Sequence, residues 1–186
     1  MGPLSILALE STPHVGPKTI EKVFSLHPEF EPSKPEDIIN VLKNTNNSYK
    51  KIYVPDIQVA THSWNKANEI IQISQHHNIR FASRYDLNYP RLLLKISNPP
   101  FLLHVLGNIN ALNRDCIAIV GTRKPTDYGI NAATKLGATL AKKGYVIVSG
   151  LAEGIDTAAH QGALDVNGTT VAVIAHGLDR IYPAKN

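Results

Sequence analysis

Two glycine-containing turns carry the residues of this sequence whose types and spacing could bind a phosphate. One turn, residues 121–124, follows an apolar run, and the other, residues 149–156, follows a second apolar run. Glycine lets the backbone approach a ligand closely, and a helix N-terminus behind such a turn offers unpaired N–H groups and partial positive charge. Arg123 can bind a phosphate in a bidentate manner, and Thr122 and Ser149 add hydroxyl groups. The pattern predicts a phosphate-binding cradle.

A simpler interpretation stays open, in which each glycine only makes a tight connection between a strand and a helix. Neither turn is a Gly-x-Gly-x-x-Gly fingerprint, and the sequence has no Walker A loop, so we expect no NAD or ATP cofactor. Asp156 and His160 share a helix face but lack a third ligand, and we expect no metal site. We assign Asp156 to capping or orienting its helix and Cys116 to the core. We expect no catalytic residues.

Alternating elements should bring both turns to one edge of a sheet. The order strand, helix, strand, helix, strand predicts βαβ units and a mainly parallel, Rossmann-like sheet. Ligands bind at the carboxyl ends of the strands in such sheets. The first strand is almost wholly apolar, which predicts a strand covered on both faces. The elements are expected at residues 116–120, 129–143, 145–148, 155–164 and 170–174.

The N-terminal part predicts a small all-helical domain, residues 1–78, ahead of an α/β domain, residues 79–186. Helices are expected over 4–10, 18–27, 35–43 and 63–77. Ser33 with Glu36 fits a capping box, and Ser63 is the expected cap of the last helix. We expect a loop over 44–48 and further strands at 79–82 and 101–106.

The segment Pro13–Thr19 is similar to the turn of a helix-hairpin-helix, with His14 where that motif has its first glycine. Such hairpins offer backbone N–H groups to DNA phosphates. Residues 1–60 carry six Lys/Arg and seven Asp/Glu, which gives little attraction for DNA. Direct DNA contact and a structural role therefore both remain open for this helix-hairpin-helix or SAM-like domain.

Composition places the 186-residue chain among globular cytoplasmic proteins. Hydrophobic residues make up 43%, no apolar run approaches the roughly 18 residues of a membrane span, and the N-terminus lacks a basic signal region. The single cysteine fits a reducing compartment. The net charge of +4 is compatible with an anionic partner but does not by itself indicate one.

Several motifs in order over the second half make the chain similar to the DprA/Smf family of DNA-processing proteins. The matching segments are Ile117–Arg123, Tyr128–Gly129, Val148–His160 and Gly177–Pro183, with a lead-in at Tyr85–Asp86, Tyr89–Pro90, Leu92–Leu93 and Asn98–Pro100. The likeness is strong over residues 79–186 and loose over 1–78.

The resemblance implies a non-enzymatic protein that binds and protects single-stranded DNA on a Rossmann-like domain. It also implies a homodimer that assists loading of the recombinase RecA in natural transformation (competence) and DNA recombination. The residues it assigns to DNA or phosphate are Gly121, Thr122, Arg123, Lys124, Ser149, Gly150 and Gly154. Tyr128 and Tyr182 could stack on bases or serve packing alone.

Two rival functions remain open. One is a nucleotide-binding sensor or a nucleotide hydrolase on the same scaffold, although Glu153 and Asp156 are the sole carboxylates beside a glycine turn. The other is a structural partner protein whose DNA site has decayed, against which the retained Arg123 speaks. Family members continue past Pro183 into further elements, so we expect either a fragment or a naturally short relative.

Overall fold

The computed structural model describes residues 1–178 and separates into two compact units, Met1–Val105 and Leu106–Asn186. The first unit contains α1 (Pro3–Glu10), α2 (Pro17–Leu26), α3 (Pro35–Tyr49), α4 (Ile57–His76), β1 (Arg80–Ser83), the short 3-10 helix η1 (Leu93–Lys95) and β2 (Leu102–Val105). The second contains the 3-10 helix η2 (Ile109–Asn113), β3 (Cys116–Ala118), α5 (Asp127–Lys142), β4 (Val146–Ser149), α6 (Ile155–Leu164) and β5 (Thr170–Ala172).

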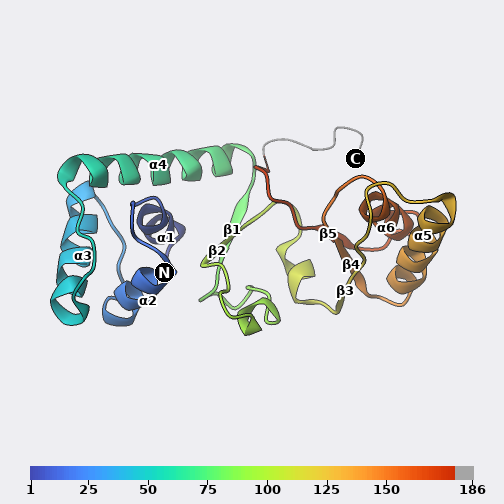
Figure 1. Ribbon diagram of the computed structural model, residues 1–186, viewed down its shortest axis with the longest axis horizontal. Coiled ribbons are helices and arrows are strands. Elements are labelled where there is room, and N and C mark those ends of the chain that lie inside the picture. Colours follow the sequence, from blue (N-terminus) through green and yellow to red (C-terminus); the bar gives the residue numbers. More distant parts are fainter. Residues whose placement is uncertain (179–186) are drawn as a thin grey trace. The chain divides into compact units, whose positions relative to one another are not determined.

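The first unit is a helical cluster to which a hairpin has been added. In Figure 1, α4 lies across α1 and α3, and both of these helices contact it. β1 and β2 pair antiparallel, with Phe81 opposite His104. Phe101 and Leu102 are buried in the same core as the helices. The boundary between compact units therefore lies after Val105, whereas the sequence suggested a domain boundary after Asn78.

Two helix ends in this unit differ from the sequence-based prediction. α4 begins at Ile57, because the Asp56 side chain accepts a hydrogen bond from the Val59 amide at 2.9 Å. Ser63, the predicted cap, lies inside the helix, is buried, and donates to the Val59 carbonyl. α3 continues to Tyr49 through the predicted loop 44–48. Its start is stabilised by Asp37 rather than Glu36, since Asp37 Oδ2 accepts from the Ser33 amide at 2.8 Å.

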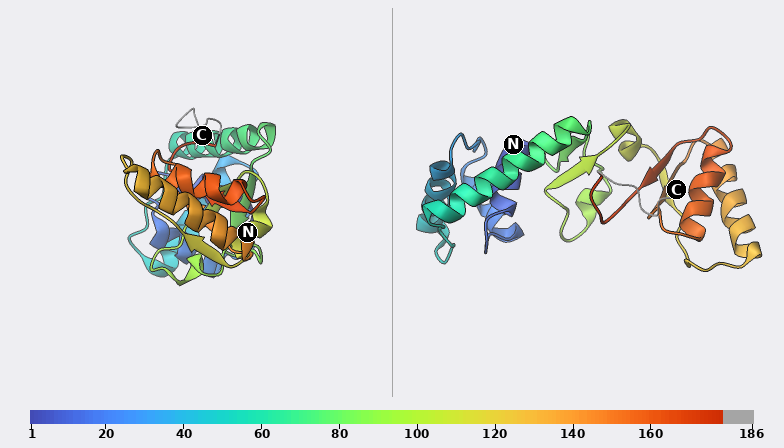
Figure 2. Two further views of the ribbon diagram at one scale, coloured as in Figure 1. Left: turned by 90° about the vertical axis from the view of Figure 1, so that its right-hand side faces the viewer. Right: turned by 90° about the horizontal axis from the view of Figure 1, so that it is seen from above.

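The second unit is a parallel three-stranded sheet in the order β3-β4-β5, which confirms the predicted Rossmann-like class. The strands are neighbours in chain order, and right-handed crossovers then place both connecting helices on one face. Figures 1 and 2 show α5 and α6 side by side there. Their face of the sheet holds Ile119 and Ile147, which pack with Ala159 and Ala163 of α6.

The prediction that the first strand is covered on both faces was wrong. β3 ends at Ala118, and the side chain of Val120 is 72% exposed. Both helices lie on the opposite face of the sheet, so the described elements of the second unit leave the carboxyl end of β3 uncovered on its other face. Within residues 1–178, no helix has the length and apolar character needed to cross a membrane.

Candidate nucleic-acid interface

The first glycine turn presents a row of polar groups at the carboxyl end of β3. Thr122, Arg123 and Lys124 are all exposed. The Lys124 amide donates to Thr122 Oγ1 at 3.2 Å, which closes the turn on itself. The amides of Gly121, Thr122 and Arg123 make no hydrogen bond within residues 1–178. Unpaired backbone N–H groups next to cationic side chains form the kind of concavity that binds anions.

The cations of this turn are not neutralised by neighbouring acids. Neither Arg123 nor Lys124 forms an ion pair with any residue of the described chain. An exposed guanidinium without a carboxylate partner keeps its donors available for a planar, bidentate acceptor such as a phosphate.

The second glycine turn has a backbone that favours glycine at one position. Gly154 has a φ of +90°, a region that side-chain-bearing residues rarely occupy. It also lies against the first turn, because a Cβ at Gly154 would come within 2.9 Å of the Pro125 ring and 3.0 Å of the Arg123 carbonyl carbon. The Ile155 amide donates to the Thr122 carbonyl at 3.2 Å. The fold therefore packs the two turns directly against each other.

Asp156 supports the second turn from inside. Its side chain is buried, and Oδ2 accepts hydrogen bonds from the amides of Gly150 at 3.1 Å and Ala152 at 3.4 Å. The carboxylate is thus used to hold the turn, in keeping with the structural role that the sequence suggested. The same bond occupies the Gly150 amide, so Gly150 contributes shape to the site rather than a donor.

Ser149 is the predicted site residue that the structure turns away from solvent. It is 3% exposed, and its hydroxyl donates to the Ile119 carbonyl at 2.6 Å. This bond ties the end of β4 to the end of β3. The surface between the turns is formed by residues 121–124 and Gly154, with Ser149 beneath it.

The helix that follows the first turn begins beside this surface. Thr126 caps α5, since its hydroxyl oxygen accepts from the Gly129 amide at 3.2 Å. Tyr128, in the first turn of the helix, is 82% exposed. Its ring is therefore accessible to a stacking partner, while Tyr182 lies outside the described residues.

Sequence reasoning missed the role of His160 in holding α6 to the sheet. The Thr170 hydroxyl donates to the Ile147 carbonyl at 2.8 Å, so it accepts from Nδ1–H of His160 at 2.6 Å. Nε2 is then the unprotonated nitrogen, and it is buried with no hydrogen-bond partner in the described structure. Burial lowers the pKa of His160, and the Asp156 carboxylate opposes this effect. The imidazole is used as a neutral structural group.

The N-terminal hairpin has a backbone that explains its similarity to a helix-hairpin-helix. His14, at the position of the motif's first glycine, has a φ of +61°, and its ring packs edge-on against Tyr53 at 5.2 Å. A residue with a side chain thus adopts the conformation that glycine favours.

These features define a class of protein: a Rossmann-like α/β unit with two packed glycine turns at one sheet edge, preceded by a helical unit. The family described as DNA recombination-mediator protein A matches residues 80–186. The chain belongs to this family.

Named relatives agree with that assignment. Protein Smf of Synechocystis sp. is 43% identical over 122 residues, which cover 63% of this chain and 31% of the relative. DNA processing protein DprA of Bacillus subtilis is 43% identical over 99 residues, covering 53% of this chain and 33% of that protein. The chain therefore spans about a third of the length of these relatives.

Two solved structures are similar to the whole chain or part of it. DNA processing protein A of Streptococcus pneumoniae matches with a TM-score of 0.74 and 28% identity, over 100% of this chain and 62% of that one. DNA processing protein A of Helicobacter pylori, whose structure was described for its single-stranded DNA binding mode, matches with a TM-score of 0.50 and 33% identity. That match covers 59% of this chain and 49% of the other.

Proposed function

We propose that this chain binds single-stranded DNA through the first glycine turn, with the second turn as its support. The observation that carries the proposal is the combination of exposed, unpaired Arg123 and Lys124 with three backbone amides that have no acceptor in the described chain. Phosphate is the anion common to every nucleotide, so such a site would bind DNA with little regard to sequence. Gly121 and Gly154 would shape the site by letting the two turns pack closely, since a Cβ at Gly121 would meet the Ile155 side chain and a Cβ at Gly154 would meet the first turn.

Each side chain around the first glycine turn would make a different contact with the DNA. Arg123 is the expected bidentate phosphate contact, and Lys124 adds charge. Tyr128 offers an exposed ring for base stacking, which is worth about 1–3 kcal/mol per base. Ser149 and Gly150 are proposed to shape the site without touching the phosphate, because their polar groups are already bonded.

The cellular role that we propose follows from the family and from the relatives. The chain would hold and protect single-stranded DNA in the cytoplasm and assist loading of the recombinase RecA, in natural transformation and recombination. We propose a homodimer that acts by binding and not as an enzyme. The rival hydrolase gains no support from geometry, because the Asp156 carboxylate is committed to backbone amides.

Fluorescence anisotropy with a labelled oligo-dT, measured over a salt series, tests the proposal. We expect tight binding that weakens steeply with salt, because each neutralised phosphate releases counterions, with a slope of about −0.7 per phosphate on single strands. Arg123→Ala should weaken binding and make the slope shallower by about one phosphate. Lys135→Ala, an exposed lysine of α5, is the charge-matched control.

Competitors separate the proposed function from its rival. Double-stranded DNA should compete poorly and a mononucleotide hardly at all. If the oligonucleotide does not bind but a free nucleotide raises the melting temperature, the DNA-binding proposal fails and the nucleotide sensor is favoured.

A further inference from the structure

The first unit exposes an apolar segment, residues 87–96, between its two strands. Leu87 is 100% exposed, Leu92 70%, Ile96 50% and Leu94 44%. In Figure 1 the segment follows the end of β1 that points away from α4. Scattered exposed leucines are ordinary on protein surfaces, but four large aliphatic side chains within ten residues are of the kind that marks an interaction site.

The backbone of this segment is anchored and bonds largely to itself. Tyr89 is 1% exposed, and its hydroxyl donates to the Pro100 carbonyl at 2.8 Å. The four successive amides of residues 93–96 donate to carbonyls of residues 90–93, at 3.0 to 3.4 Å. A turn whose amides are paired internally can enter an apolar medium without the cost of unsatisfied N–H groups. The aliphatic side chains are thus presented on a turn that a medium without hydrogen-bonding groups can accept.

The charges of the segment have a single sign. Arg91 and Lys95 are exposed within it, and residues 87–96 contain no acid. The nearest acid along the chain is Asp86, whose carboxylate accepts from the Ser83 amide at 2.8 Å. Lysine and arginine can lay their alkyl stems along an apolar surface while their charges stay at its edge. Protruding aliphatic side chains with cations beside them complement a lipid bilayer whose headgroups are anionic.

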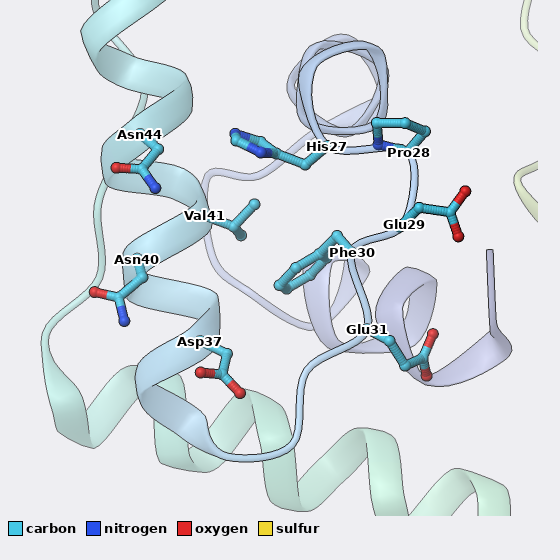
Figure 3. Close-up of a pocket in the computed structure, with 9 residues that line it drawn as sticks. All are labelled: His27, Pro28, Glu29, Phe30, Glu31, Asp37, Asn40, Val41 and Asn44. Carbon is cyan, nitrogen blue, oxygen red and sulfur yellow. The ribbon is translucent and has the colours of Figure 1, made fainter.

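Three acids of the same unit lie together on a different surface. Figure 3 shows a pocket of about 530 Å³ between the loop after α2 and the side of α3, which Glu29, Glu31 and Asp37 help to line. Hydrogen bonds from Ser33 lower the pKa of Asp37, which keeps it ionised. None of residues 87–96 lines this pocket. An anionic surface repels the pocket and attracts the segment, so the two features favour one orientation of this unit.

We propose that residues 87–96 contact the surface of an anionic phospholipid bilayer. The three leucines and Ile96 lie at the boundary between headgroups and acyl chains, and Arg91 and Lys95 lie among the headgroups. A fluid bilayer adapts to side chains that protrude separately, whereas a protein partner needs a groove shaped to all four. The small apolar area makes the contact weak and reversible. The inference does not depend on DNA binding by the other unit.

Flotation of the full chain with vesicles tests the proposal, using equimolar phosphatidylcholine and phosphatidylglycerol beside phosphatidylcholine alone. We expect binding to the anionic vesicles that weakens with salt, and much less binding to the neutral ones. Leu92→Asp should lower the partition coefficient at least about tenfold, because an acid replaces an inserted leucine. Leu164→Asp, at an exposed leucine of α6, is the matched control and should leave it unchanged.

Two further pairs of variants locate the contact. Lys95→Ala should lower the partition coefficient about fivefold, and Lys135→Ala, an exposed lysine of α5, should not change it. The emission of Leu87→Trp should shift to shorter wavelength when anionic vesicles are added, whereas that of Leu164→Trp should not. Both tryptophan variants retain Trp64, so the unchanged chain supplies the background spectrum.

Arg123→Ala separates this contact from capture of headgroup phosphate by the first glycine turn. The variant should bind anionic vesicles as the unchanged chain does, although its oligo-dT binding is weakened. The proposal is overturned if the chain does not bind the vesicles, or if Arg123→Ala loses vesicle binding while Leu92→Asp keeps it. A chain that ignores vesicles but changes its sedimentation in Leu92→Asp covers the segment with protein, which overturns the lipid contact as well. Oligo-dT binding is measured separately, so the two proposals can fail independently.

Discussion

Replacing Gly154 with alanine tests the contact between the two glycine turns. At a φ of +90°, a residue with a Cβ costs on the order of 1–3 kcal/mol in backbone strain. The new methyl would also meet the Pro125 ring at 2.9 Å and the Arg123 carbonyl carbon at 3.0 Å. Both neighbours belong to the backbone or to a rigid ring, so the first turn must move. Overpacking of this kind adds about 1–3 kcal/mol.

The chain offers two controls that separate these effects. Gly144 has the same φ of +90° but open space around its missing Cβ, so Gly144→Ala carries the strain alone. Gly16 precedes α2 with a φ of −94° and likewise has open space, so Gly16→Ala should be close to neutral. We expect Gly154→Ala to lower the free energy of unfolding most, Gly144→Ala to lower it less, and Gly16→Ala to lower it least.

Urea unfolding followed by circular dichroism gives the free energies. The single tryptophan, Trp64, lies in α4 and reports on the first unit by its fluorescence. Gly154→Ala should lower the urea concentration at the midpoint of the transition followed by circular dichroism. It should also weaken oligo-dT binding. If Gly154→Ala costs no more than Gly144→Ala, the turns do not pack as described and the proposed site loses its support.

Two further changes probe how α6 is held in place. His160 is neutral in the fold and its pKa is lowered, so the unfolded chain takes up the proton first as the pH falls; stability should be full above about pH 6.5 and decline below it. His160→Gln lacks this titrating imidazole, so its free energy of unfolding should fall less between pH 7.5 and 5 than that of the unchanged chain. An equal fall in the variant and in the unchanged chain would contradict the role of His160. Gly162→Ala would place a methyl against the Thr134 carbonyl of α5 and should cost about 1–3 kcal/mol despite alanine's better helix propensity. Thermal melts check this second prediction. An unchanged or raised melting temperature would show that α6 can shift away from α5 with little loss of stability.

The sequence determined the elements of the second unit because their signals are local. Apolar runs and glycine turns alternate there, and α6 has the predicted bounds, Ile155–Leu164. The family resemblance rested on the same residues, and it was confirmed. Helix ends in the first unit were harder, since several polar residues compete as caps. Asp56 caps α4, while Ser63 is buried where its hydroxyl reaches the Ser11 carbonyl at 3.2 Å.

Tertiary structure alone decided what each site residue can offer. Ser149 and Arg123 both lie in glycine turns with plausible phosphate chemistry, yet the first is bonded inward to Ile119 and the second is exposed. The packing of Gly154 on the first turn joins residues some thirty positions apart. The burial of Phe101 joins residues still farther apart in the sequence, because its ring packs near that of Phe24 in α2. No local pattern encodes such contacts, because they depend on which surfaces the strands and helices bring together once the chain has folded.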